Sequence, residues 1–70
     1  MNLIKLHTRH ANDIILIKSK YIIAIQSCKD NYDKEYSVVY IRGGYDFKVR
    51  ETVRDILVKI NERDNNNEQM

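Results

Sequence analysis

Two adjacent glycines, Gly43 and Gly44, constrain the fold more than any other feature of this sequence. They are the only glycines in the 70-residue chain, and they separate two runs rich in β-branched and aromatic residues, 36–42 and 45–49. Glycine reaches positive φ without steric cost, and tight two-residue β-turns require that conformation. The pattern therefore predicts a β-hairpin over 36–49 that turns at the glycine pair.

A two-residue turn also predicts which side chains share a face of the hairpin. It gives three cross-strand pairs on one face: Arg42 with Tyr45, Tyr40 with Phe47, and Val38 with Val49. The opposite face then carries Val39 and Ile41. We expect the aromatic face to pack in the core, which leaves Val39 and Ile41 pointing away from it.

Three apolar runs before the hairpin predict three further strands, at 2–7, 14–17 and 21–28. In the first run Ile4 and Leu6 alternate with Lys5 and His7, which is typical of a half-buried strand. Polar segments at 8–13 and 18–20 separate the runs. The charged segment 29–35 is expected to be an exposed loop.

After the hairpin the apolar period changes from two residues to that of an α-helix. Four side chains form one stripe at i, i+3, i+4 and i+7: Val53, Ile56, Leu57 and Ile60. Thr52 is a good N-cap with Asp55 in the position of a capping box, and Glu51 suits the helix dipole. We expect the helix to end near Arg63, and residues 64–70 to form a disordered polar tail.

These elements predict one mainly β domain of the α+β class over residues 1–63. It is a five-stranded antiparallel meander or open small barrel with one C-terminal α-helix. A helix of about twelve residues is ~18 Å long and covers one face of such a sheet. Because the runs 14–17 and 21–25 are apolar on both faces, both faces should be buried. We therefore expect a homo-oligomer or a protein partner, with an interface formed by Ile15, Ile17, Ile23, Val39 and Ile41.

Charge favours an alternative partner. Residues 1–60 hold eleven Lys or Arg and seven Asp or Glu, a net charge of +4. Basic residues alternate with tyrosines along the predicted strands, and cations neutralise phosphates while aromatic rings stack on bases. Nucleic-acid binding is therefore the alternative function, with contacts from Lys18, Lys20, Arg42, Lys48 and Arg50.

The sequence offers little that predicts catalysis or a bound metal. His7 and His10 have a spacing that metal ligands can show, but no further ligands have a recognisable spacing, and Cys28 is far along the chain. The oxygen-rich segment 30–35 lacks the glycine and the distant glutamate of a calcium loop. We expect no catalytic residues, cofactor, metal or small-molecule substrate.

Cysteine usage and hydropathy bear on the compartment. Cys28 is the only cysteine, so no disulfide can form within one chain, and this fits a reducing environment. No apolar run approaches the roughly 20 residues that span a bilayer, and no signal peptide is visible. We expect a cytoplasmic protein without a membrane span.

Two family resemblances follow from these motifs. The chain resembles the small FlbD-type flagellar and swarming-motility proteins over most of residues 3–60. The resemblance lies in Ile4-Lys5-Leu6, in the spacing of Ile22 and Ile25, and in a hairpin leading into Val49-Arg50-Glu51-Thr52-Val53. Segment 29–35 looks like an insertion. This resemblance implies a non-enzymatic protein that acts by interaction at or near the flagellar motor.

The second resemblance is to the first half of LytTR-type DNA-binding domains. There a Tyr-Ile-x-x-Ile strand precedes a polar loop, a glycine-containing hairpin and a short helix, which is similar to Tyr21-Ile22-Ile23-Ala24-Ile25 and the segments that follow it. The second half of those domains, which carries much of the DNA contact, has no counterpart in this sequence. The resemblance implies nucleic-acid binding as the alternative function.

Overall fold

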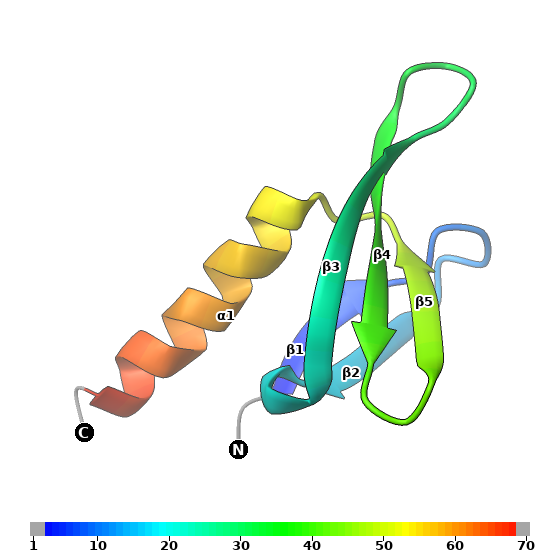
Figure 1. Ribbon diagram of the computed structural model, residues 1–70. Coiled ribbons are helices and arrows are strands. Elements are labelled where there is room, and N and C mark those ends of the chain that lie inside the picture. Colours follow the sequence, from blue (N-terminus) through cyan, green and yellow to red (C-terminus); the bar gives the residue numbers. More distant parts are fainter. Residues whose placement is uncertain (1–2, 69–70) are drawn as a thin grey trace.

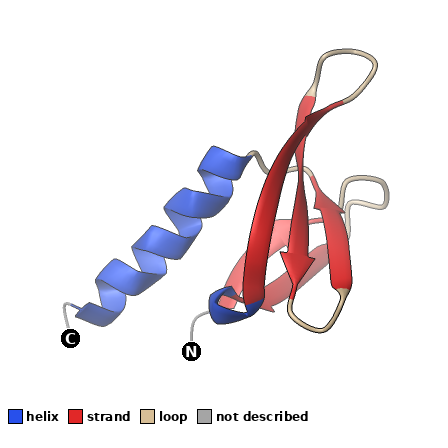
Figure 2. Cartoon of the chain, viewed as in Figure 1, coloured by secondary structure: helices blue, strands red, loops and turns tan. Residues whose placement is uncertain are grey.

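The computed structural model describes the backbone of residues 3–68 and the side chains of residues 3–62. Five strands precede one helix (Figure 1): β1 (Leu3–His7), β2 (Ile14–Lys18), β3 (Ile22–Lys29), β4 (Glu35–Ile41), β5 (Tyr45–Val49) and α1 (Val53–Glu68). A short 3₁₀ turn, η1 (Ser19–Tyr21), separates β2 from β3. The prediction of a mainly β chain with a C-terminal helix is confirmed, and Figure 2 shows the helix along one side of the strands.

The strands divide into two antiparallel sheets, β1–β2 and β3–β4–β5. Of the two arrangements that we predicted, the single meander is wrong, because β2 and β3 do not pair, whereas an open arrangement of five antiparallel strands fits. The reason is η1, which carries the chain from one sheet to the other. The sheets meet at one corner, where Thr8 bridges to Val49 and the Arg50 N–H donates to the carbonyl of His7. They remain open elsewhere.

The β4–β5 hairpin forms as expected, but its predicted register is wrong by one residue. Three residues, Arg42 to Gly44, connect the strands, and the Gly44 N–H donates to the carbonyl of Ile41 at 3.3 Å. Both glycines have positive φ, 102° at Gly43 and 92° at Gly44. The observed pairs include Val39 with Phe47, Ile41 with Tyr45, and Tyr40 with Asp46.

A one-residue slip exchanges the two faces of a hairpin. Here it places Val39 against Phe47, and it leaves Tyr40 beside the charged Asp46 on the outer face. The Tyr40 hydroxyl donates to Gln26 of β3 at 2.7 Å, so its polar end has a partner there. The apolar residues of β5 share one face in either register. The observed register brings Val39 and Ile41 of β4 onto that face, where the two-residue turn would place Tyr40 and Arg42.

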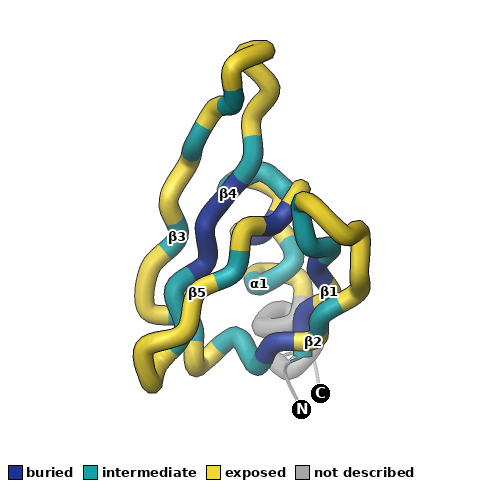
Figure 3. Tube along the Cα trace, turned by 90° about the vertical axis from the view of Figure 1, so that its right-hand side faces the viewer, coloured by how far each residue is buried: buried dark blue, intermediate teal, exposed yellow. Residues whose placement is uncertain are grey.

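The core lies between the two sheets and under α1. Its buried side chains come from all three parts: Ile4, Leu6, Ile17, Val39, Val49 and Ile56. Figure 3 shows buried residues along β4 and β1, whereas β3 has none. The inner faces of the sheets therefore cover one another, which accounts for much of the apolar surface that we had assigned to a partner.

One polar side chain is enclosed with this core. Ser37 of β4 is fully buried, and its hydroxyl has no hydrogen-bond partner among the described residues. A buried unpaired hydroxyl costs stability, on the order of 1–3 kcal/mol. Ser37 is thus a weak point in the packing of β4.

Helix α1 begins as predicted but continues further. The Asp55 N–H donates to the Thr52 hydroxyl at 3.1 Å, and the Thr52 N–H faces the Asp55 carboxylate at 3.5 Å, so the capping box is present. We expected an end near Arg63, whereas α1 continues to Glu68. No glycine or proline occurs after residue 60 to stop it. The predicted tail, 64–70, thus overlaps the helix through Glu68, and its last two residues lie outside the described residues.

No helix within residues 3–68 is both long enough and apolar enough to cross a bilayer.

Candidate functional site

An apolar groove runs beside β2 and the β4–β5 hairpin. It has a volume of about 680 Å³, and eight of its nine lining residues are aliphatic or aromatic. They include Leu3, Ile15, Leu16, Ile41, Tyr45 and Phe47. We refer to it as the apolar groove.

The backbone of β2 explains why the groove is there. Four consecutive β2 residues, Ile15 to Lys18, line it. Side chains alternate between the two faces of a strand, so a consecutive run means that the edge of β2 borders the groove. β2 pairs with β1 on one side, and no described strand pairs with its other side. That edge therefore presents backbone N–H and C=O groups that another strand could bind.

The surface around the groove is unusually apolar. Leu16 is 61% exposed and Tyr45 is 69% exposed, although both belong to strands. Ile14, also on β2, is 58% exposed. A contiguous exposed apolar patch on a small protein is typical of an interaction surface.

Basic side chains gather at one end of this groove. The ammonium groups of Lys18 and Lys20 lie 5.7 Å and 5.4 Å from the centroid of the Tyr21 ring. The backbone N–H of Arg42 donates to the carbonyl of Tyr21 at 2.8 Å, which fixes the hairpin turn against η1. Lys18, Lys20 and Arg42 thus lie next to Tyr21 in the fold, and we call these three residues the basic rim.

The structure brings together only part of the predicted nucleic-acid contact. Lys18, Lys20 and Arg42 share the basic rim. Lys48 lies on the outer face of β5, opposite Val38. Arg50 follows β5 at the corner where the sheets meet, and it lines a different groove. The five basic residues therefore do not form one surface.

The predicted protein interface also divides. Ile15, Ile17 and Ile41 line the apolar groove. Val39 is fully buried in the core, so its side chain offers no surface in this fold, contrary to the outward position that we expected. Ile23 is the extra residue of a β-bulge in β3, between Ile22 and Ala24, and it is 68% exposed away from the groove. The groove is also lined by Leu3, Leu16, Tyr45 and Phe47. We did not predict these four from the sequence, because we assumed a single sheet and a different hairpin register.

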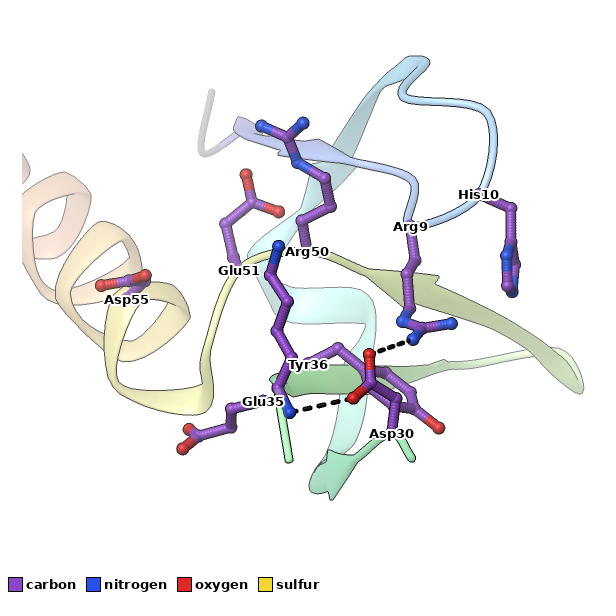
Figure 4. A pocket seen from close by; sticks show the side chains of 9 residues that line it. Arg9, His10, Asp30, Glu35, Tyr36, Arg50, Glu51 and Asp55 are labelled. Carbon is purple, nitrogen blue, oxygen red and sulfur yellow. Dashed lines mark hydrogen bonds and ion pairs between the residues drawn. The ribbon is translucent and has the colours of Figure 1, made fainter. Parts of the chain in front are cut away.

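A second, polar groove of about 770 Å³ lies at the corner between the sheets and the start of α1 (Figure 4). Arg9 donates to the Asp30 carboxylate at 2.9 Å, and its guanidinium lies 4.2 Å from the centroid of the Tyr36 ring. Asp30 also accepts the backbone N–H groups of Tyr32 and Lys34. The Lys34 N–H contributes most to holding the pKa of Asp30 below its usual range, and the Tyr32 N–H and Arg9 add to this against the effect of burial.

Glu51 has a comparable structural position. Its carboxylate accepts the backbone N–H of His7 at 3.0 Å and the Nδ1 of His7 at 2.7 Å. Burial raises the pKa of Glu51, but these hydrogen bonds from His7 more than offset that effect, so the pKa lies below its usual value. Two carboxylates of the polar groove are thus used within the chain: Asp30 connects the β1–β2 loop to the β3–β4 loop, and Glu51 connects β1 to the segment before α1.

The candidate metal ligands His7, His10 and Cys28 do not form a metal site in the structure. Within residues 3–62, no three His, Cys, Asp or Glu side chains come close enough to hold a metal ion. His7 is occupied by Glu51, and Cys28 lies half-buried on β3.

Comparisons with known proteins add no family to these observations. No protein-family model matches the chain, and no curated protein and no solved structure matches it significantly.

Proposed function

We propose that this chain is a non-catalytic interaction module that binds a protein chain in its apolar groove. The bound chain is a second copy of this protein or a different protein. The observation that carries the proposal is the position of the groove next to an unpaired strand edge. Natural proteins usually protect such edges with charges, proline or a covering loop, whereas β2 presents exposed Ile14 and Leu16.

The polar groove gives no reason to assign catalysis, which agrees with the same proposal. Its Asp30 is paired with Arg9, and its Glu51 is paired with His7 of β1. A catalytic acid or base must be able to exchange its proton with a substrate. Stabilising the fold is a sufficient role for these groups. The resemblance to FlbD-type proteins, which implies action by interaction, agrees with the proposal.

Two measurements together test this function. Sedimentation velocity over a concentration series reports self-association, and an array of random-sequence peptides reports binding to other chains. We expect a complex in at least one of them. A protein that stays monomeric at high concentration and binds no peptide of the array would contradict the proposal.

A matched pair of variants assigns the binding to the groove. Tyr45→Asp places a charge at the groove, and Tyr45 is exposed enough for the fold to tolerate it. Tyr32→Asp makes the same change in the β3–β4 loop, where Tyr32 is 90% exposed. We expect only Tyr45→Asp to weaken the complex, and equal effects of both variants would place the contact elsewhere.

Nucleic-acid binding is the second candidate, and the basic rim beside Tyr21 and Tyr45 favours it. In that case affinity for a labelled oligonucleotide should fall steeply with salt, because each phosphate contact releases counterions. Lys20→Glu should weaken the complex, and Arg54→Glu on α1 should not. A flat titration with single-stranded DNA and RNA at low salt would dispose of this candidate.

A further inference from the structure

We propose that the occupant of the apolar groove is an extended, acidic segment of another protein, which pairs as an added strand with the free edge of β2. This inference rests on the proposed function and commits it to one class of partner. It is carried by three features: the strand edge, the aliphatic lining and the basic rim.

The edge of β2 determines the conformation of the partner. β2 has five residues, so at roughly 3.3 Å per residue it offers about 16 Å of unpaired backbone. An extended peptide can satisfy these N–H and C=O groups by strand addition, while alternate side chains of the peptide enter pockets. The apolar groove provides such a pocket, because Ile15 and Phe47 line it beside that edge.

The basic rim determines the charge of the partner. Among the described residues, Lys18, Lys20 and Arg42 take part in none of the ion pairs. Asp46, the acidic residue of β5, belongs to the outer face opposite Tyr40. A segment that runs along β2 towards η1 therefore meets positive charge, and carboxylates on it would be favoured.

The same charges disfavour a second copy as the occupant. The whole chain carries a net charge of +2, and residues 1–60 carry +4, so two copies repel each other. A two-fold symmetric contact through this groove would also bring two copies of the basic rim into one interface. An acidic partner removes this repulsion.

The groove fits a peptide better than a nucleic acid. The Tyr21 ring has two ammonium groups over it, which a stacking base would have to displace. The groove is otherwise lined largely by aliphatic side chains such as Leu3, Ile15 and Ile17, which read no base edge. Free backbone groups at a strand edge pair with another peptide backbone.

Fluorescence anisotropy with matched synthetic peptides tests the proposal. One labelled peptide alternates glutamate with valine, and the other has lysine in place of each glutamate. We expect the glutamate peptide to bind at least roughly tenfold more tightly, because it complements the basic rim. Equal binding of both peptides would overturn the assignment of an acidic partner and leave the proposed function standing.

A third peptide tests the strand pairing itself. It keeps the glutamate–valine sequence but has N-methyl groups on alternate amides, which removes the donors facing β2 and keeps the side chains. A fourth peptide carries the N-methyl groups on the other set of alternate amides. We expect binding to be lost for the one of these two peptides whose methylated amides face β2. Unchanged affinity of both methylated peptides would overturn strand addition.

Variants of the protein locate the contact. Lys18→Glu combined with Lys20→Glu should weaken binding of the glutamate peptide roughly tenfold, whereas Lys34→Glu, in the β3–β4 loop, should not. Circular dichroism of each variant verifies that it is folded. Tighter binding of oligothymidine than of the peptide through the same lysines would assign the groove to nucleic acid instead. A dimer that Leu16→Asp disrupts, without peptide binding, would assign it to a second copy.

Discussion

The contact between His7 and Glu51 shows how single residues hold the two sheets and the helix together. Glu51 follows β5 and precedes α1, and its carboxylate binds both the backbone and the ring of His7 on β1. From the sequence, Glu51 was expected only to favour the helix dipole. Its partner is 44 residues away in the chain, a separation at which no local spacing rule applies. The sequence could therefore identify the residue but not its contact.

This contact predicts a pH-dependent loss of stability. The pKa of Glu51 is lowered from its ordinary 4.5, because hydrogen bonds from His7 offset the effect of burial. A lowered folded-state pKa means that the ionised carboxylate stabilises the fold above pH 4.5, and that this contribution is lost as the pH falls through the folded-state pKa. Glu51→Gln should thus lower the free energy of unfolding by about 1 kcal/mol at pH 7 and by less in acid.

Urea denaturation of both proteins at pH 7 and at low pH measures this difference. The exposed Glu35, which has no ion pair among the described residues, supplies the control Glu35→Gln. If the effect of Glu51→Gln were the same at both pH values, the carboxylate would not be the source of the stabilisation.

At the scale of elements, local patterns predicted positions better than registers. The capping box at Thr52 and Asp55 was correct because its partners are three residues apart. The hairpin was located correctly, yet its turn has three residues instead of two. A two-residue turn and a three-residue turn both use glycine at positive φ, so the glycine pair alone did not distinguish the two turn types. The observed register buries Val39 against the other sheet, and that contact is not local.

The turn itself predicts a cost for adding a side chain. At Gly44, φ is +92°, and a Cβ there would meet no other atom within 4 Å. Gly44→Ala should therefore be destabilising through backbone strain alone, by about 1–2 kcal/mol. Chemical denaturation should show this loss, whereas Arg42→Ala, at the preceding non-glycine turn position, should have a small effect. A Gly44→Ala protein as stable as the parent would mean that the turn does not hold Gly44 at positive φ.

At the scale of the whole molecule, the sequence indicated too much apolar surface for one sheet and one helix. It could not distinguish a second chain from a second sheet, because both bury strands that are apolar on both faces. In the structure, Ile4, Leu6 and Ile17 of the β1–β2 sheet are buried in a core shared with the β3–β4–β5 sheet. The apolar groove remains after this packing, where the sheets are open between β2 and the β4–β5 hairpin. Its location depends on how the two sheets meet, so it could not be derived from the strands taken singly.

The role of α1 in this arrangement gives a prediction for the whole fold. Among its side chains up to residue 62, Ile56 alone is fully buried, and it joins a core supplied by both sheets. Ile56→Ala should cost about 2–5 kcal/mol. The total stability of small domains is typically about 5–15 kcal/mol, so the loss would be a large fraction. Leu57→Ala removes a similar side chain from the next position, which is 48% exposed, and should cost far less.

Denaturant unfolding of the two variants, followed by circular dichroism, measures this contrast. Amide hydrogen exchange adds a spatial readout, because loosening of α1 should lower protection in β1 and β3, the strands that it contacts. Equal costs at Ile56 and Leu57 would mean that α1 is stabilised by its own cap and helix propensity. In that case the helix would not hold the two sheets over a common core, and the opening beside β2 would have to be explained by the sheets alone.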